Sequence, residues 1–262
     1  MSDRGTMGNT GEFILECQNI MKSFALKSRT IAVLNCINLN VARGQIYVIT
    51  GRSGSGKSTL LGLMGGIERQ TSGSIRFKDV YLERLSNESL ANLRRKSIGI
   101  ICQSHNLISS WTAYENVDAV LMHSGLSAAK RAEKIKSLLN EFGLDGMLDN
   151  LPSELSAGQQ QRVAIARTLV NEPEIILADE PTGEVDSETS IEIIKHLFLP
   201  VRERHVALVV VTKGDFLFNI IQNESKLDSE ALPCIKNIFT LSGGTLSFLG
   251  DLENNKSVLL GM

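Results

Sequence analysis

Short apolar runs alternate along this chain with longer stretches in which apolar residues recur every three or four positions. Apolar runs bounded by turn residues are typical of buried strands, and the longer spacing is typical of helices with one buried face. Strands separated by helices in this way favour an α/β fold. The predicted strands cover residues 13–17, 34–41, 45–50, 73–77, 98–102, 174–178 and 206–212.

The helical stretches carry recognisable start signals. Residues 86–96 have helical spacing, and Ser86 is the expected N-cap. Most of 113–169 is expected to be helical, as is 187–198. Residues 235–249 have the alternation of a closing hairpin around a Ser-Gly-Gly turn.

One glycine-rich segment joins the strand at 45–50 to the apolar helix predicted from residue 60. It obeys the P-loop rule of Gly, four residues, Gly, Lys and then Ser or Thr. Its members are Gly51, Arg52, Ser53, Gly54, Ser55, Gly56, Lys57, Ser58 and Thr59. The glycines allow backbone N–H groups to approach phosphate oxygens, Lys57 can reach the β- and γ-phosphates, and Ser58 can ligate Mg²⁺. A plain glycine-rich turn lacks this strand–helix context, and a dinucleotide fingerprint has different glycine spacing. The segment predicts a nucleoside triphosphate site.

Two strand ends carry polar groups that suit such a site. The strand at 98–102 ends at Gln103, where ligands bind in open α/β sheets. The strand at 174–178 ends at Asp179 and Glu180, an arrangement that matches the Walker B pair. Asp179 would belong to the Mg²⁺ shell, and Glu180 would accept a proton from the attacking water. The alternative for each is an ordinary polar strand end.

The predicted helix that starts at Ser156 has two small residues in its first turn. Ser156 and Gln159 form a Ser-x-x-Gln capping box, which explains both residues structurally. The box leaves Ala157 and Gly158 unexplained, because bulkier helix formers would stabilise the first turn better. A helix N-terminus with small residues suits close approach to an anion.

Together these segments resemble the ATPase subunit of ABC transporters. The resemblance rests on the P-loop, Gln103, LSAGQQQRVAIARTLV from Leu155 and IILADEPTG from Ile175. The run from Leu93 is most similar to the branch serving lipoprotein release, macrolide export and bacterial cell division.

The resemblance implies a P-loop NTPase fold with a RecA-like core. An antiparallel β subdomain and a helical subdomain, inserted at about 104–171, would complete a nucleotide-binding domain at 12–249. Tails at 1–11 and 250–262 would flank it, the first of them disordered.

The same resemblance implies a set of functions. Two ATP molecules with Mg²⁺ would lie at the interface of a head-to-tail homo- or heterodimer. Phe24 would stack on adenine, although the residues alone leave open a place in the core. Gln103 would join the metal shell and the catalytic groups, and Asp186 would be the D-loop aspartate. Integral membrane permease subunits would be the partners, which places the protein peripherally at the cytoplasmic face of the cell membrane.

Two positions depart from the family pattern. Ala157 stands where glycine is usual, and one methyl group is compatible with helical φ. Lys213 stands where the family has a histidine after Thr212. An ammonium donates hydrogen bonds but accepts none, unlike a neutral imidazole. The alternative function is therefore a nucleotide-gated regulatory module with weak hydrolysis.

Composition narrows the choice of partners. The 262 residues are 42% hydrophobic and 21% charged, with a net charge of −2. Because there is no basic tract, no nucleic-acid partner is expected. No apolar run is long enough to cross a bilayer, and the first residues lack a signal-peptide layout. The cysteines at 17, 36, 102 and 234 lie far apart in apolar runs, so each is interpreted as a small buried hydrophobe.

Overall fold

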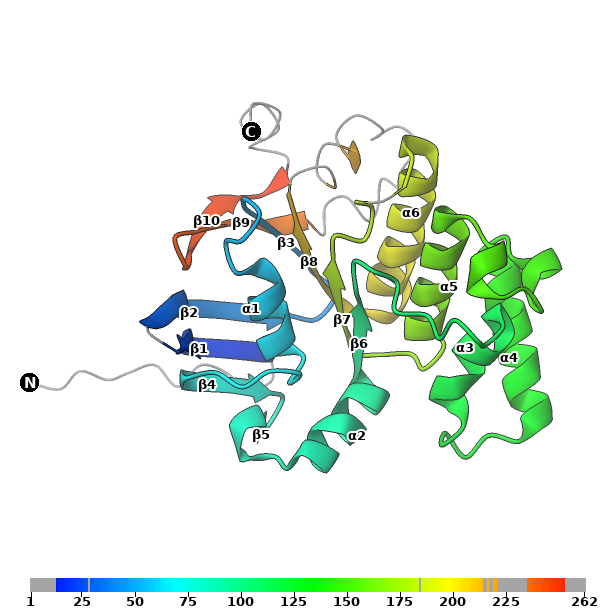
Figure 1. Ribbon diagram of the computed structural model, residues 1–262, viewed down its shortest axis with the longest axis horizontal. Coiled ribbons are helices and arrows are strands. Elements are labelled where there is room, and N and C mark those ends of the chain that lie inside the picture. Colours follow the sequence, from blue (N-terminus) through cyan, green and yellow to red (C-terminus); the bar gives the residue numbers. More distant parts are fainter. Residues whose placement is uncertain are drawn as a thin grey trace, which may run out of the picture.

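In the computed structural model, the described residues form two β-sheets with α-helices packed around them (Figure 1). The structure describes residues 13–27, 29–183, 185–213, 216, 219–220 and 235–252. The predicted tail at 1–11 and residues 253–262 of the predicted C-terminal tail lie outside these ranges. At the other end, Leu252 is buried in the core, so the packed fold continues past residue 249.

The central sheet has six strands in the order β10-β9-β3-β8-β7-β6. Their bounds are β3 (Ile46–Thr50), β6 (Ile98–Ile101), β7 (Ile175–Asp179), β8 (Ala207–Thr212), β9 (Ile235–Ser242) and β10 (Thr245–Gly250). All neighbours are parallel except β10, which pairs antiparallel with β9 in the predicted hairpin. The carboxyl ends of β3, β6, β7 and β8 therefore meet at one edge of the sheet, where ligands bind in this class of fold.

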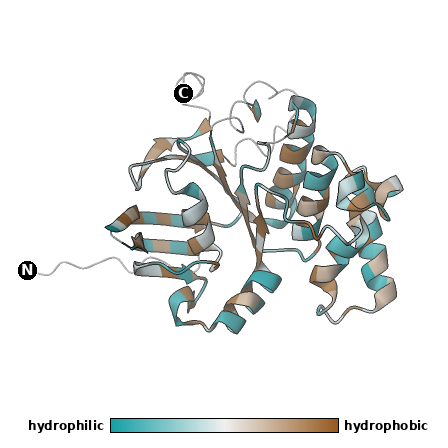
Figure 2. Cartoon of the chain, in the orientation of Figure 1, coloured by the Kyte–Doolittle hydropathy of each residue, from teal (hydrophilic) through white to brown (hydrophobic). Residues whose placement is uncertain are grey.

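Strands β3, β7 and β8 are buried on both faces, so their side chains alternate between two cores. Ile176 and Leu208 belong to the core beneath the helices, whereas Leu177 and Val209 face the second sheet. This two-sided burial explains why the strands are continuous apolar runs in the sequence. Figure 2 shows these strands as the most hydrophobic part of the chain, with polar and apolar residues alternating along the helices.

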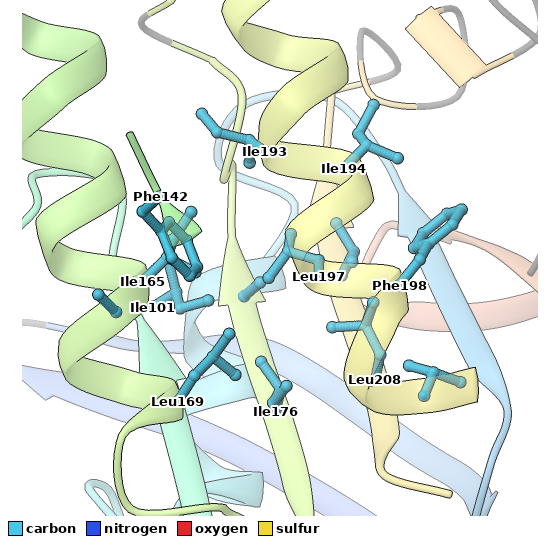
Figure 3. Packing of buried hydrophobic residues seen from close by; sticks show 14 of the residues in the cluster. Ile101, Phe142, Ile165, Leu169, Ile176, Ile193, Ile194, Leu197, Phe198 and Leu208 are labelled. Atoms are coloured by element: carbon cyan, nitrogen blue, oxygen red, sulfur yellow. The ribbon is translucent and has the colours of Figure 1, made fainter. Parts of the chain in front are cut away.

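The part of the chain that the structure describes has six longer α-helices. They are α1 (Lys57–Met64), α2 (Asn87–Ser97), α3 (Ala113–Leu121), α4 (Ala128–Glu141), α5 (Ala157–Leu169) and α6 (Ser187–Arg204), with short 3₁₀ turns at Leu82–Arg84, Asp145–Met147 and Pro152–Glu154. Side chains of α5 and α6, among them Ile165, Leu169 and Leu197, point toward Ile176 and Leu208 of the sheet (Figure 3). The α3–α5 helices lie together on the same side as α6 (Figure 1).

The second sheet is antiparallel, in the order β2-β1-β4-β5. Its strands are β1 (Phe13–Leu26), β2 (Arg29–Ala42), β4 (Ser72–Phe77) and β5 (Val80–Tyr81). β1 and β2 are longer than predicted because their far halves pair in a mostly exposed ribbon, which leaves no hydrophobic pattern in the sequence. This sheet packs through the second core onto α1 and the central sheet.

Several local predictions have clear outcomes. The N-cap at Ser86 is confirmed, since its side chain accepts a hydrogen bond from Ser89 N at 3.1 Å. The predicted end of the last long helix at residue 198 is wrong, because α6 continues through Pro200 to Arg204. The interpretation of every cysteine as buried is also wrong. Cys17 is buried, but Cys36 is exposed with a φ of 54°; Cys234 lies outside the described residues.

Candidate active site

The P-loop turns from β3 into α1 through glycines with left-handed backbone. Gly54 has a φ of 77°, and Gly56 has a φ of 101° and is the N-cap of α1. A residue with Cβ would be strained at either position. No side chain caps α1, and its first turn holds no acidic residue. Its first N–H groups and the positive end of its dipole are therefore available to an anion.

Gly51 is required for a different reason, which is close contact with β9. A Cβ at this position would lie 2.5 Å from the carbonyl oxygen of Leu241. The C-terminal hairpin therefore packs directly against the start of the P-loop.

Lys57 lies folded onto the loop that precedes it. Its Nζ donates to the carbonyl oxygens of Gly51 at 2.6 Å and Arg52 at 3.1 Å, and the residue is 6% exposed. Burial lowers the pKa of Lys57, while the nearby carboxylates of Glu180 and Asp179 act in the opposite direction. An ammonium has three donor hydrogens, so one remains for a ligand.

Glu180 follows β7 in a strained conformation. Its φ is 48°, which is uncommon outside glycine and costs on the order of 1–3 kcal/mol. Its amide donates to Val211 O of the neighbouring strand at 2.9 Å, which fixes this turn. Burial raises the pKa of the Glu180 carboxyl, and the backbone N–H of Lys213 and the cations of Lys213 and Lys57 act against that rise. A carboxylate with a raised pKa is suited to accept a proton.

Lys213 follows the next strand, β8, and faces Glu180. Its backbone N–H donates to Oε2 of Glu180 at 3.3 Å, and its Nζ lies 3.9 Å from Oε1. The lysine side chain is 50% exposed, so solvent screens this ion pair. The ammonium of Lys213 thus contacts solvent on one side and the Glu180 carboxylate on the other.

These groups line one cavity of about 350 Å³ at the carboxyl edge of the sheet. Of the predicted site residues it contains Ser53, Gly54, Gly56, Lys57, Ser58, Thr59, Gln103, Asp179, Glu180 and Lys213. Gly51, Arg52 and Ser55 belong to the same loop but not to the lining. Val33 from β2 also lines the cavity; nothing in its apolar run distinguishes it as a site residue.

The chemistry of the lining fits a nucleotide with a metal ion. The free N–H groups of α1 and the ammonium of Lys57 suit phosphate oxygens. Ser58, Gln103 and Asp179 offer oxygen atoms, which are the ligands that Mg²⁺ prefers.

The remaining predicted residues lie elsewhere. The capping box at Ser156 is confirmed: Ser156 Oγ accepts from Gln159 N at 3.3 Å, and Gln159 Oε1 accepts from Ser156 N at 2.8 Å. Since Oγ acts there as an acceptor, its own hydrogen stays available for donation. Neither residue, nor Ala157 or Gly158 between them, lines the cavity.

Gly158 also has a packing reason that the sequence did not show. A Cβ there would lie 2.9 Å from Cγ2 of Thr189. Thr189 in turn donates through Oγ1 to Asp186 Oδ2 at 2.7 Å, and Asp186 is the N-cap of α6. The N-termini of α5 and α6, with Ser156 and Asp186, therefore adjoin each other outside the cavity.

Phe24 lies on β1 and does not line the cavity. It is 40% exposed, so the alternative of a core residue is wrong. Lys22 Nζ lies 4.6 Å from the centroid of its ring. One aromatic face is thus already paired with a cation.

The segment between β6 and α3, residues 102–112, is held by a residue that the sequence did not single out. Asn116 is 0% exposed. Its Oδ1 accepts from Ile108 N at 2.8 Å, and its Nδ2 donates to the carbonyls of Ile108, Trp111 and Thr112 at 3.0–3.1 Å. A buried amide so fully bonded fixes the loop conformation. An isolated asparagine in a helical stretch carries no sequence signal of this role.

Comparison with known proteins decides the family. The model of the ABC transporter family matches residues 34–183. The chain belongs to the ABC transporter family. It is 44% identical over 204 residues to the lipoprotein-releasing system ATP-binding protein LolD of Geobacter metallireducens, covering 78% of this chain and 91% of that one. It is 39% identical to the ATP-binding protein YtrE of Bacillus subtilis, covering 84% and 96%. It is 39% identical to the macrolide export ATP-binding/permease protein MacB of Acinetobacter baylyi, but spans only 30% of that protein.

Solved cassettes have the same fold as this ABC ATPase. The dimeric structure of the bacterial cassette MJ0796 superposes with a TM-score of 0.78 at 33% identity, covering 89% of this chain and 96% of that one. A second dimeric structure of MJ0796 represents a post-hydrolysis state with ADP and Pi, also with a TM-score of 0.78, covering 90% and 98%. The predicted P-loop NTPase fold and the resemblance to the LolD and MacB branch are confirmed, and the chain is an ATP-binding subunit with ATPase chemistry.

Proposed function

We propose that this ABC ATPase hydrolyses Mg-ATP to drive separate membrane subunits in a transporter of the lipoprotein-release or macrolide-export type. The observation that carries the proposal is the cavity in which the P-loop, Gln103, Asp179 and Glu180 meet. The similarity to LolD over 91% of its length supports the transporter type.

Within the cavity each residue has a proposed role. The P-loop N–H groups and Lys57 bind the phosphates, while Ser58, Gln103 and Asp179 hold Mg²⁺. When bound at these residues, Mg²⁺ would neutralise charge on the phosphate oxygens. Glu180 accepts the proton of the attacking water, and its raised pKa strengthens it as a base.

The second half of the site comes from a second cassette, which can be a copy of this chain or a related one. Ser156 to Gln159 and Asp186 lie together outside the cavity, and Ser156 Oγ keeps a free hydrogen. In a head-to-tail dimer the segment from Ser156 to Gln159 of one subunit closes the γ-phosphate face of the other, which stabilises transition-state charge. Phe24 is proposed to stack on adenine, for which its exposed ring is suited. ATP-dependent dimerisation, measured by sedimentation with Glu180→Gln, tests this arrangement.

Permease docking is assigned to residues 104–117 in the helical subdomain, for which we keep boundaries of about 104–171. The surrounding domain, predicted at 12–249, extends at its C-terminal end to Leu252. Asn116 holds this loop so that Ile108 is 41% exposed and Asn106 and Glu115 face solvent. Docking there places the protein at the cytoplasmic face of the cell membrane. Among the described residues, no helix is both long and apolar enough to span a bilayer.

Crosslinking tests the docking assignment. A photo-crosslinker at Asn106 or Glu115 should capture the permease in native membranes. The matched control is Val80 on β5 of the second sheet, which is 42% exposed, close to the 41% of Ile108 in the docking segment. Capture from Val80 alone would mean that the permease binds the second sheet, which would contradict docking at residues 104–117.

A second candidate function is favoured by the Lys213–Glu180 contact. A cation 3.9 Å from the proposed base would weaken it as a proton acceptor. ATP would then drive dimerisation with little turnover, as in a nucleotide-gated regulatory module. Steady-state phosphate release from the assembled complex separates the two functions, since only the transporter ATPase turns over many times per bound nucleotide.

A further inference from the structure

Arg167, in the last turn of α5, binds the loop that follows Gln103. Its Nη1 donates to the carbonyl oxygen of Asn106 at 2.7 Å and its Nη2 to that of His105 at 2.8 Å. The connection from β6 to α3 passes beside α5 at this point (Figure 1). The planar guanidinium fork suits two adjacent acceptors, which an ammonium cannot engage in the same way.

The backbone that Arg167 holds is strained. His105 has a φ of 53° and Asn106 a φ of 50°. Each left-handed residue outside glycine costs roughly 1–2 kcal/mol. Asparagine and histidine tolerate this region better than most residues, and the hydrogen bonds from Arg167 hold both of them in it.

Placing the charged side chain of Arg167 against the protein has a desolvation cost. Burial lowers the pKa of its guanidinium. Among the described residues no carboxylate lies within 4.0 Å of it to form a salt bridge. A half-buried cation compensated by carbonyl oxygens contributes little net stability. The hydrogen bonds from Arg167 to His105 and Asn106 therefore indicate that the function needs this conformation of the loop after Gln103.

The helix that carries Arg167 also contacts the residue after Glu180. Gln161 of α5 is 2% exposed, and its Nε2 donates to the carbonyl oxygen of Pro181 at 2.8 Å. Thr168 Oγ1 donates toward Ile100 O of β6 at 3.1 Å. One helix thus touches the segments that carry both Gln103 and Glu180, and it begins at Ser156.

We propose that Arg167 is a positioning residue for Gln103. Arg167 holds the His105–Asn106 turn on α5 and so keeps Gln103 at the edge of the cavity. The position of Gln103 is thereby linked to α5, the helix that begins at Ser156. The proposal rests on the proposed role of Gln103 in the metal and γ-phosphate site. For hydrolysis by the chain without its permease, the proposal predicts that Arg167 acts only through Gln103.

A double-mutant cycle tests this dependence on the full-length chain. Arg167→Gln should lower kcat by about 10- to 100-fold, the range for a misplaced catalytic group, and raise the Mg²⁺ concentration at half-maximal rate. The affinity for ATP should change by less than about twofold, because the P-loop is untouched. Arg167→Lys should recover part of the rate. In a Gln103→Ala background, Arg167→Gln should cause no further loss. A full additional loss there would overturn the proposal.

Hydrogen exchange provides a readout that does not need turnover. Amides of residues 104–111 should exchange faster in Arg167→Gln than in the wild type. Arg162→Gln is the matched control, because Arg162 lies on the same helix but pairs with Glu192 of α6 at 3.1 Å. Unchanged exchange at 104–111 in Arg167→Gln would overturn the proposal. If the wild type does not hydrolyse ATP, the proposed function is contradicted. The exchange measurement still tests the role of Arg167 in that case, because it does not depend on turnover.

Discussion

Lys213 contacts both carboxylate oxygens of Glu180, one through its backbone N–H at 3.3 Å and the other through Nζ at 3.9 Å. The residue that follows β8 therefore fixes the carboxylate that follows β7. A histidine at the same position would keep the backbone contact and replace a fixed cation with a group that both donates and accepts. The departure expected from the family pattern therefore concerns the Lys213 side chain and leaves its main-chain contact unchanged.

Replacing that side chain is the most informative change. Lys213→His should raise kcat at saturating Mg-ATP by about tenfold, which corresponds to about 1.4 kcal/mol of transition-state stabilisation. The rate is measured on the complex with its membrane partner, with nucleotide affinity determined separately. Lys213→Gln is the control that removes the charge without supplying an imidazole. A lower rate in Lys213→His would identify the lysine as the working γ-phosphate contact.

Glu180→Gln should preserve ATP binding and slow hydrolysis by roughly 10²–10⁴-fold, the contribution of a positioned general base. The amide keeps the size of the side chain but cannot accept the proton. Single-turnover phosphate release measures the effect, and ATP-bound dimers should accumulate. Hydrolysis at the wild-type rate would exclude Glu180 as the base.

The pH dependence follows from the burial of Glu180. Because burial raises the pKa of this carboxyl, it becomes protonated, and inactive as a base, at a higher pH than an ordinary glutamate. The acidic limb of kcat against pH should therefore lie above the reference value of about 4.3. Removing the cation with Lys213→Gln should move the limb further upward. A downward movement would show that the lysine does not act on Glu180.

Lys57→Ala should abolish tight ATP binding, because the β- and γ-phosphates lose the ammonium of the P-loop. Isothermal calorimetry measures the affinity. The control is Lys134→Ala, which removes an ammonium paired with Glu172 far along the sequence from the P-loop. Equal affinity in Lys57→Ala and the wild type would contradict the assignment of the phosphate site.

Gly158→Ala should destabilise the fold by about 1–3 kcal/mol, the usual cost of overpacking. The added Cβ would lie 2.9 Å from Cγ2 of Thr189. Thermal unfolding measures the loss. Thr189→Ser, which removes Cγ2, should restore most of the stability in the double variant. If it does not, the contact with Thr189 is not the reason for this glycine.

The sequence predicted those features that local chemistry determines. The strands of the central sheet are apolar runs, and Gly56, Lys57 and Ser58 follow β3 at the spacing that is typical of a phosphate-binding loop. Because parallel strands end at one edge, Gln103 and Glu180 could be placed in the same site from their positions in the sequence.

Other features depend on contacts between distant segments. Asn116 and Arg167 look like ordinary helix residues until the loop after Gln103 is folded against them. The exposed ribbon of β1 and β2 has no buried face and so no periodicity. The continuation of α6 through Pro200 is set by packing of Phe198 and Val201 in the core, which overrides the local preference to stop.

The order of strands in the central sheet also constrains how the chain is made. β3 lies between β8 and β9, which are among the last strands of the sequence. As the protein leaves the ribosome from its N-terminus, β1 and β2 emerge before β3, and the strand that leads into the P-loop must then wait for both neighbours while β4 to β7 and helices α1 to α6 emerge. Nucleotide can therefore act as a folding ligand only after β9 has been synthesised, so nascent chains that end before Ile235 should not be stabilised by ATP.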